Sequence, residues 1–352
     1  MSLKSHATII DDIQSLLGSN TTDFTDAILT LRLAEALPDF SRFSPFKGRE
    51  TLYTTEDSKE LDLSHLENLL WVDALEYRID KDEREWREFT EHYHNNLSME
   101  IDFYPVDEDS GIDTDEALDT SETGVDCDAD ATTAIPVGTV IRIDNELMYV
   151  TATGTTLTVV RGYSNTTGAA HTTDANIMIP EKAYLYCAEV HRVPVVADIA
   201  GAATAAYTAG VVTINVDGLT TTGTIEAGTT FTITGDGTGT HYRVLKDVVL
   251  SGGAGDFVFT PALAEAVAND DVVTFDNSTL TPRQETLLID LVAARAAKSI
   301  STKFINEINV GGPGAWKDWV AWGEDKYREV LPKLEAEARR YQAVRKTWPR
   351  SY

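Results

Sequence analysis

The hydrophobic pattern of this chain changes its period twice, and that change limits the folds open to it. Residues 7–43 and 281–344 place apolar side chains at helical spacing, whereas residues 133–276 alternate apolar and polar side chains as strands do. The middle region is rich in Thr, Val and Gly, and glycine-containing turns separate its short apolar runs. We therefore expect an α+β chain in which helices from both ends flank inserted β-sandwich or barrel units.

Both ends carry recognisable helix boundaries. The first helix should stop at Gly18, and a second should start at a cap near Thr22 or Thr25, with Pro38 kinking or ending it. In the C-terminal part, Thr281 is a good N-cap with Pro282 at the first helical position, and a last helix is predicted over 316–344.

Between these helical ends, several further segments have their own signatures. Residues 49–79 predict strands around a polar turn. For 82–97 we expect a short amphipathic helix, since Trp86 and Phe89 are three residues apart and Tyr93 follows four later. Residues 100–130 hold 13 acidic residues and no Lys or Arg, which predicts a solvated connector or long loop.

These segments divide the chain into six parts. A helical domain would comprise 1–105, with a β-hairpin, and 278–352, with a basic tail. An acidic linker would occupy 106–132, and 181–199 would be a strand returning to the helical domain. The inserted β modules would be 133–180 and 200–277.

Charge and cysteine content exclude several classes of protein. With 57 Asp and Glu against 29 Lys and Arg, the formal net charge is −28, so the surface should repel DNA phosphates instead of gripping them. Cys127 and Cys187 are the only cysteines, too few for a disulfide framework or a zinc cage. The N-terminus lacks the apolar core of a signal peptide, and no stretch is apolar enough for a membrane span. We expect synthesis and folding in the cytoplasm.

Candidate catalytic and ligand-binding motifs are weak. His92 and His94 would share one face only if they lay on a strand, and a polar surface patch explains them better than a metal site. The run from Asp107 fails the calcium-loop register, because Gly111 is fifth instead of sixth and position twelve is Leu118. The glycines from Gly235 lack the Lys-Ser/Thr of a phosphate-binding loop and suit a hairpin turn. We expect no enzyme activity, no metal and no cofactor.

Two β segments resemble modules of tailed-phage virion proteins. The first is Pro136-Val-Gly-Thr-Val-Ile-Arg-Ile-Asp-Asn-Glu-Leu-Met-Tyr-Val, followed by Thr156-Leu-Thr-Val-Val-Arg-Gly-Tyr and Gly168-Ala-Ala-His. In it Arg161-Gly162 should make a tight turn, and the strands should pack over Ile143 and Val150. The second is Gly228-Thr-Thr-Phe-Thr-Ile with Tyr242-Arg-Val-Leu and Pro261-Ala-Leu. Capsid, neck and tail proteins all carry such modules.

The helical ends resemble head-to-tail connector adaptors of tailed phages. The matching runs are Leu31-x-x-Ala-x-Ala-Leu-Pro-Asp-Phe-Ser-Arg-Phe-x-Pro, Leu61-Asp-Leu-Ser, Val72-Asp-Ala-Leu-Glu-Tyr, Tyr184-Leu-Tyr-x-Ala-x-Val-His and Pro282-x-x-Glu-Thr-Leu-Leu. The resemblance implies a ring, expected to be a dodecamer, in the virion neck beneath the portal protein and above a tail-side protein. Packaged DNA would pass through it without tight binding. The β insertion at 130–276 departs from the small adaptors.

Two sets of residues are candidates for these contacts. The basic tail follows the last acid, Glu337, and is the candidate portal interface, although the bases could instead complement the negative end of the last helix. Its members are Arg339, Arg340, Arg345, Lys346, Trp348, Arg350 and Tyr352. The candidate acidic surface facing the DNA consists of Asp107, Glu108, Asp109, Asp113, Asp115 and Glu116.

Other readings of the chain remain open. A capsid, decoration or tail protein could share the same β modules, although helical ends argue against a mostly β tail tube. A receptor- or glycan-binding attachment module should cluster aromatic side chains on its β region, whereas Tyr163, Tyr207 and Tyr242 are scattered along it. The acidity suits either a saline host or a DNA channel.

Overall fold

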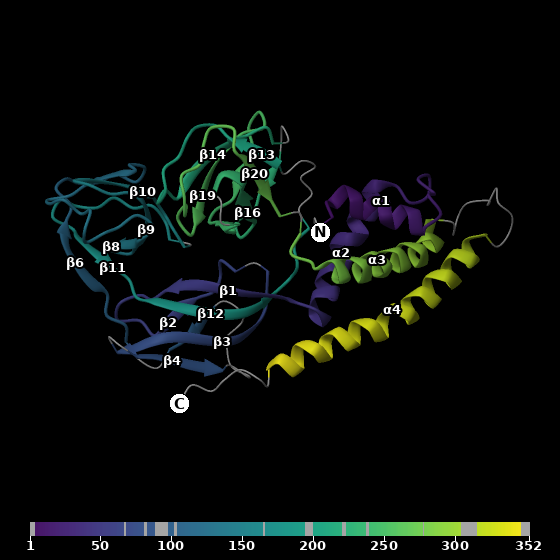
Figure 1. Ribbon diagram of the computed structural model, residues 1–352. Coiled ribbons are helices and arrows are strands. Elements are labelled where there is room, and N and C mark those ends of the chain that lie inside the picture. The colour runs from purple at the N-terminus through teal and green to yellow at the C-terminus, as the bar shows by residue number, and fades with distance from the viewer. Residues whose placement is uncertain are drawn as a thin grey trace. The chain divides into compact units, whose positions relative to one another are not determined.

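The computed structural model describes residues 4–66, 68–80, 83–88, 98–101, 104–164, 166–193, 200–219, 223–236, 239–276, 278–303 and 315–345. Of residues 79–80, 83–88, 301–303, 315–316 and 340–345 only the backbone is described. The chain is a mixed α and β protein that divides into two compact units (Figure 1). Unit 1 comprises Met1–Lys47, Ala188–Ala197 and Asn277–Tyr352, and unit 2 comprises Gly48–Cys187 and Asp198–Asp276.

Unit 1 is helical, and local capping sets the helix starts. Its helices are α1 (His6–Leu16), α2 (Asp26–Phe43), α3 (Pro282–Lys303) and α4 (Ala315–Arg345). The Thr25 side chain caps α2 by accepting from the Ile28 N–H. Thr281 and Gln284 cap α3 reciprocally, since each side chain accepts the backbone N–H of the other. Helix α2 continues through Pro38 to Phe43, so this proline does not end it.

One hydrophobic core holds the four described helices of unit 1 together. Ile9 and Ile13 of α1, Leu29 of α2, Leu288 of α3 and Val330 of α4 are all fully buried in it. The core therefore joins segments from the two ends of the sequence. Burial of one such side chain is worth about 1.5–3 kcal/mol.

The described residues of unit 2 form three larger β assemblies and two strand pairs, and the first assembly is a four-stranded sheet in the order β1-β12-β3-β4. Its strands are β1 (Phe46–Tyr53), β12 (Lys182–Glu189), β3 (Leu69–Asp80) and β4 (Glu83–Glu88), and the short β2 (Glu60–Asp62) and β5 (Ser98–Glu100) pair with each other. The amphipathic helix predicted for 82–97 is wrong over 83–88. This segment pairs antiparallel with β3, with Ala74 opposite Glu88 and Tyr77 opposite Glu85. Residues 89–97, including His92 and His94, lie outside the described residues.

The second assembly is a six-stranded sheet in the order β6-β11-β8-β9-β10-β7. Its strands are β6 (Glu108–Asp113), β11 (Asn176–Ile179), β8 (Val140–Ile143), β9 (Glu146–Ala152), β10 (Thr156–Val160) and β7 (Gly124–Asp126). Ile143 and Val150 are fully buried in its core, as expected from the sequence.

The solvated linker predicted at 106–132 needs correction, because β6 and β7 are strands of this sheet. Ile112, Leu118 and Val125 bury their side chains in the same core as β8 and β9. These few apolar residues, spaced among the acids, are enough to attach the segment. Apart from the buried Asp107, the acidic side chains of the segment are exposed or partly exposed.

The third assembly is a closed barrel in the order β13-β14-β19-β17-β16-β20. Its strands are β13 (Ala200–Ala203), β14 (Thr213–Asp217), β19 (Gly255–Thr260), β17 (Tyr242–Val244), β16 (Thr230–Ile233) and β20 (Val272–Phe275), with η1 (Thr234–Asp236) after β16 and a separate pair β15 (Thr224–Ile225) and β18 (Val248–Val249). Phe231, Phe257, Phe259 and Phe275 fill the interior together with Tyr242. Within the described residues, no helix is both long and apolar enough to cross a membrane.

Candidate functional site

A buried carboxylate, that of Glu146, forms hydrogen bonds with several segments of the six-stranded assembly. Glu146 begins β9, directly after the turn at Asp144 and Asn145, and its side chain is 0% exposed. It accepts hydrogen bonds from Arg161 Nε and Nη2, both at 2.7 Å, which is the two-bonded geometry of a strong ion pair. The backbone N–H groups of Gly162 and Ala169 donate to the same carboxylate at 2.9 Å.

The side chain of His171 contacts the Glu146 carboxylate and, together with Glu146 and Arg161, forms a buried polar cluster. Its Nε2 lies 2.9 Å from Glu146 Oε2, and its Nδ1 lies 2.7 Å from Asp144 Oδ2. His171 also pairs through its backbone with Leu118, with both N···O distances at 3.0 Å. Through these contacts the cluster attaches the acidic segment to β9.

The electrostatics of Glu146 show that it is a stable anion. Burial raises the pKa of Glu146, but hydrogen bonds from Arg161, Ala169, His171 and Gly162 outweigh that effect and hold the pKa at about 2. Each carboxylate oxygen is already hydrogen-bonded, so the group is not poised to accept a proton from a substrate. The arrangement is suited to holding strands and loops together.

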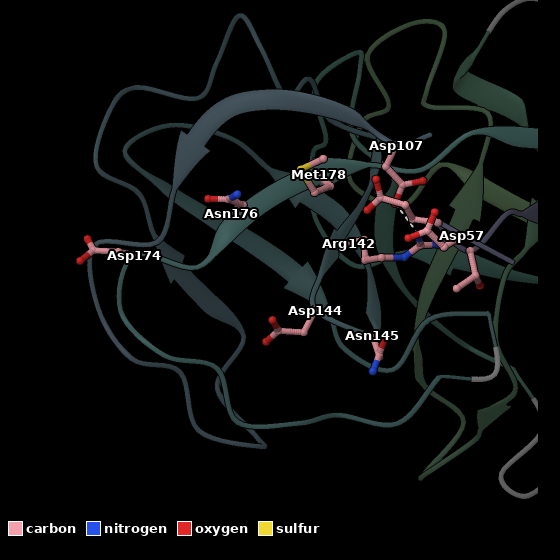
Figure 2. Close-up of a pocket in the computed structure, with 10 residues that line it drawn as sticks. Asp57, Asp107, Arg142, Asp144, Asn145, Asp174, Asn176 and Met178 are labelled. Carbon is pink, nitrogen blue, oxygen red and sulfur yellow. Dashed lines mark hydrogen bonds and ion pairs between the residues drawn. The ribbon is translucent and has the colours of Figure 1, made fainter. Parts of the chain in front are cut away.

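A polar cavity of about 540 Å³ lies beside this cluster, also within unit 2 (Figure 2). It is lined by Thr55, Glu56, Asp57, Asp107, Arg142, Asp144, Asn145, Asp174, Asn176 and Met178. Thr55 to Asp57 belong to the turn after β1, whereas Arg142 to Asn145 belong to β8 and the turn that follows it. Asp144 thus faces both the cavity and His171.

A buried ion pair forms one wall of this cavity. Arg142 Nη1 donates to Asp107 Oδ2, and Arg142 Nη2 donates to the backbone carbonyl of Thr54. The side chains of Arg142 and Asp107 are 8% and 1% exposed. Burial raises the pKa of Asp107, against the opposing effects of Arg142 and of the Glu181 backbone N–H.

The six acidic residues predicted to face DNA have different environments. Glu108, Asp109, Asp115 and Glu116 are exposed, and Asp113 is half-buried. Asp107 is buried in its ion pair with Arg142, so the prediction of an exposed Asp107 is wrong. The pKa of Glu116 is raised, chiefly by Asp126 and Glu122, which shows that like charges crowd this surface.

The predicted basic tail is only partly described. Arg339 is exposed on α4, and α4 also contains Arg340 and Arg345, whose side chains are outside the description. Lys346, Trp348, Arg350 and Tyr352 lie beyond the described residues. The hypothesis of a portal contact through these seven residues therefore stays a prediction.

Sequence reasoning missed the ionic partnership of Glu146, Arg161 and His171. A signal for it is present, because Glu146 starts an apolar run and Arg161 ends another. Charged residues are rarely buried without a partner of opposite sign, so an acid at the start of one apolar run and a base at the end of the next indicate a pair.

Across the described ranges, no three His, Cys, Asp or Glu side chains come together as a metal centre would require.

Comparisons with known proteins do not assign this chain to a family. The sequence was compared with protein-family models and with curated proteins, and the fold with solved structures, and none of the three comparisons found a match.

Proposed function

We propose that this chain is a structural, non-enzymatic component of a tailed-virus particle, acting as a head-to-tail connector in a ring beneath the portal. The observation that carries the proposal is the shared core of unit 1, in which α1 and α2 pack with α3 and α4 from the opposite end of the sequence. This supports the expected plan of a helical domain interrupted by β insertions. The resemblance of those insertions to virion modules points to the same class.

The charge distribution is compatible with a passage for DNA. Glu108, Asp109, Asp115 and Glu116 present exposed carboxylates along and after β6. Such a surface repels phosphates, so DNA would slide past it without being held. In this function the acidic surface makes no sequence-specific contact with the bases of the DNA.

In this proposal the C-terminal segment, residues 338–352, binds the portal protein. After Glu337 the sequence contains five basic and no acidic residues, within a chain of formal charge −28. Trp348 and Tyr352 are side chains of the type that dominate interface energies. This segment therefore has both the charge and the anchors for a separate partner.

The test is pull-down and negative-stain imaging of the purified protein with its neighbouring portal, with and without residues 338–352. Rings that bind portal and are lost on truncation are the expected result. A Trp348→Ala variant should weaken the complex, whereas Arg328→Gln, which removes a base of α4 whose side chain is 73% exposed, should not. A monomer, or a ring indifferent to portal, would instead favour a capsid-decorating or tail protein.

A further inference from the structure

The polar cavity of unit 2 has a strong excess of negative charge. Its lining contains five carboxylates, those of Glu56, Asp57, Asp107, Asp144 and Asp174, against the single guanidinium of Arg142. That guanidinium is already engaged with Asp107 and with the Thr54 carbonyl. The cavity therefore offers a net negative environment to anything that enters it.

Asp107 provides an independent sign of an incomplete site. The carboxylate interacts with Arg142, which donates to Oδ2, and with the Glu181 backbone N–H, but its buried Oδ1 has no hydrogen-bond partner in the part of the chain that the structure describes. Leaving a buried charged oxygen without a donor is costly. Asp107 lines the cavity although its side chain is only 1% exposed, so a donor to Oδ1 has to approach from the cavity side.

The size and lining of the cavity indicate which kind of cation fits. A calcium ion needs six to eight oxygens at 2.3–2.6 Å, and no group of three acidic or histidine ligands converges within the described residues. A volume of about 540 Å³ is instead in the range of small-molecule sites. Asn145 and Asn176 add amide oxygens, and the half-buried Met178 supplies an apolar surface for a methylene chain.

We propose that this cavity binds an organic cation, an alkylammonium or alkylguanidinium group, whose N–H donors reach Asp107 Oδ1 while the surrounding carboxylates balance its charge. The alkyl part lies along Met178. The cation can belong to a free polyamine or to a Lys or Arg side chain of a protein segment. This binding site does not depend on the role of the chain in a virus neck.

Calorimetric titration of the full-length protein tests the proposal, with spermidine, agmatine, calcium chloride and a peptide of residues 338–352 as separate probes. The pocket variant is Glu56→Gln with Asp57→Asn, since both side chains are exposed and Asn is suited to the left-handed backbone at residue 57, where φ is +59°. The matched control is Asp115→Asn with Glu116→Gln, which removes the same charge from exposed positions outside the cavity.

The expected result is saturation at one organic cation per chain, with affinity about tenfold weaker in the pocket variant and changed less than twofold in the control. Equal weakening in both variants would reduce the effect to general attraction by an acidic protein and overturn the proposal. Calcium binding that displaces the organic probes would also overturn it. Spermidine binding alone would identify a free amine as the ligand, and peptide binding that displaces agmatine would identify a protein side chain.

Discussion

Glu146 and Arg161 form a buried ion pair in which Arg161 Nε and Nη2 each donate to one carboxylate oxygen at 2.7 Å. Arg161 also donates through Nη1 to the backbone carbonyls of Asp119 and Glu122, at 3.0 and 2.7 Å. One side chain therefore ties β9 to the acidic segment that precedes β7.

Replacing Glu146 should destabilise that assembly strongly. Glu146→Gln leaves Arg161 buried beside a neutral amide, and breaking such a pair costs about 3–5 kcal/mol. Urea unfolding followed by circular dichroism measures the loss. Glu116→Gln, at an exposed position of the same assembly, should change the free energy of unfolding by less than about 0.5 kcal/mol. Equal effects of the two substitutions would contradict a structural role for the pair.

Gly162 should be required by the turn that follows Arg161. Its φ is +61°, and a Cβ there would lie 3.0 Å from the Thr166 carbonyl oxygen. Gly162→Ala should therefore cost about 1–2 kcal/mol in the free energy of unfolding. Gly154→Ala is the control, because its φ is outside the left-handed region and its nearest neighbouring atom is at 3.7 Å. The melting temperature should therefore be lower for Gly162→Ala than for Gly154→Ala. A Gly162→Ala variant as stable as the parent protein would contradict the requirement for glycine.

His191 should make unit 1 sensitive to acid. Burial lowers the pKa of His191 to about 4, where it packs near Phe40 and contacts the Ser44 carbonyl at 2.8 Å and Thr279 Oγ1 at 2.9 Å. The imidazole of His191 therefore binds a proton more tightly in the unfolded chain than in the folded one. As a result, the contribution of His191 to the free energy of unfolding is complete above pH 6.5 and decreases as the pH drops toward 4. Between pH 7.5 and 4.5 the loss should be about 2–3 kcal/mol.

The measurement for His191 is urea unfolding at 222 nm across that pH range. In His191→Gln, the free energy of unfolding should fall by about 2–3 kcal/mol less between pH 7.5 and 4.5 than in the parent protein. This difference is expected whatever the effect of the substitution at pH 7.5. His6 and His65 also have lowered pKa values and shift stability in the same direction, so the comparison is between variant and parent. His241→Gln is the control, since that side chain is 63% exposed. An unchanged slope in His191→Gln would exclude this histidine as the source.

The shared helical core predicts that the two chain ends depend on each other. Leu288→Ala in α3 should cost about 2–5 kcal/mol, because the side chain is fully buried among α1, α2 and α4 residues. Leu31→Ala in α2 is the matched control, since Leu31 is 55% exposed. Hydrogen exchange should show faster exchange in α1 and α2 as well as in α3 when Leu288 is truncated. Loss of protection confined to α3 would contradict a common core.

Local signals determined the parts of the structure that depend on neighbouring residues. The cap at Thr25, one of two candidates with Thr22, and the Thr281–Pro282 start of α3 depend on side chains within one helical turn, and the range predicted for the last helix, 316–344, agrees with α4. The alternation around Ile143 and Val150 likewise predicts their burial, since strand neighbours point to opposite faces.

Tertiary structure decided what depends on partners distant in the chain. Trp86 has helical spacing to Phe89, yet its segment becomes β4 because β3 provides hydrogen-bonding partners. The charge of the 100–130 segment predicts solvation, but burial of Ile112 and Val125 attaches it to a sheet. Asp107 looks like one more surface acid until Arg142, 35 residues away, pairs with it. The Glu146, Arg161 and His171 cluster also arises only when β9, β10 and the following loop meet, since an ion pair is stable in the interior only where folding supplies the opposite charge.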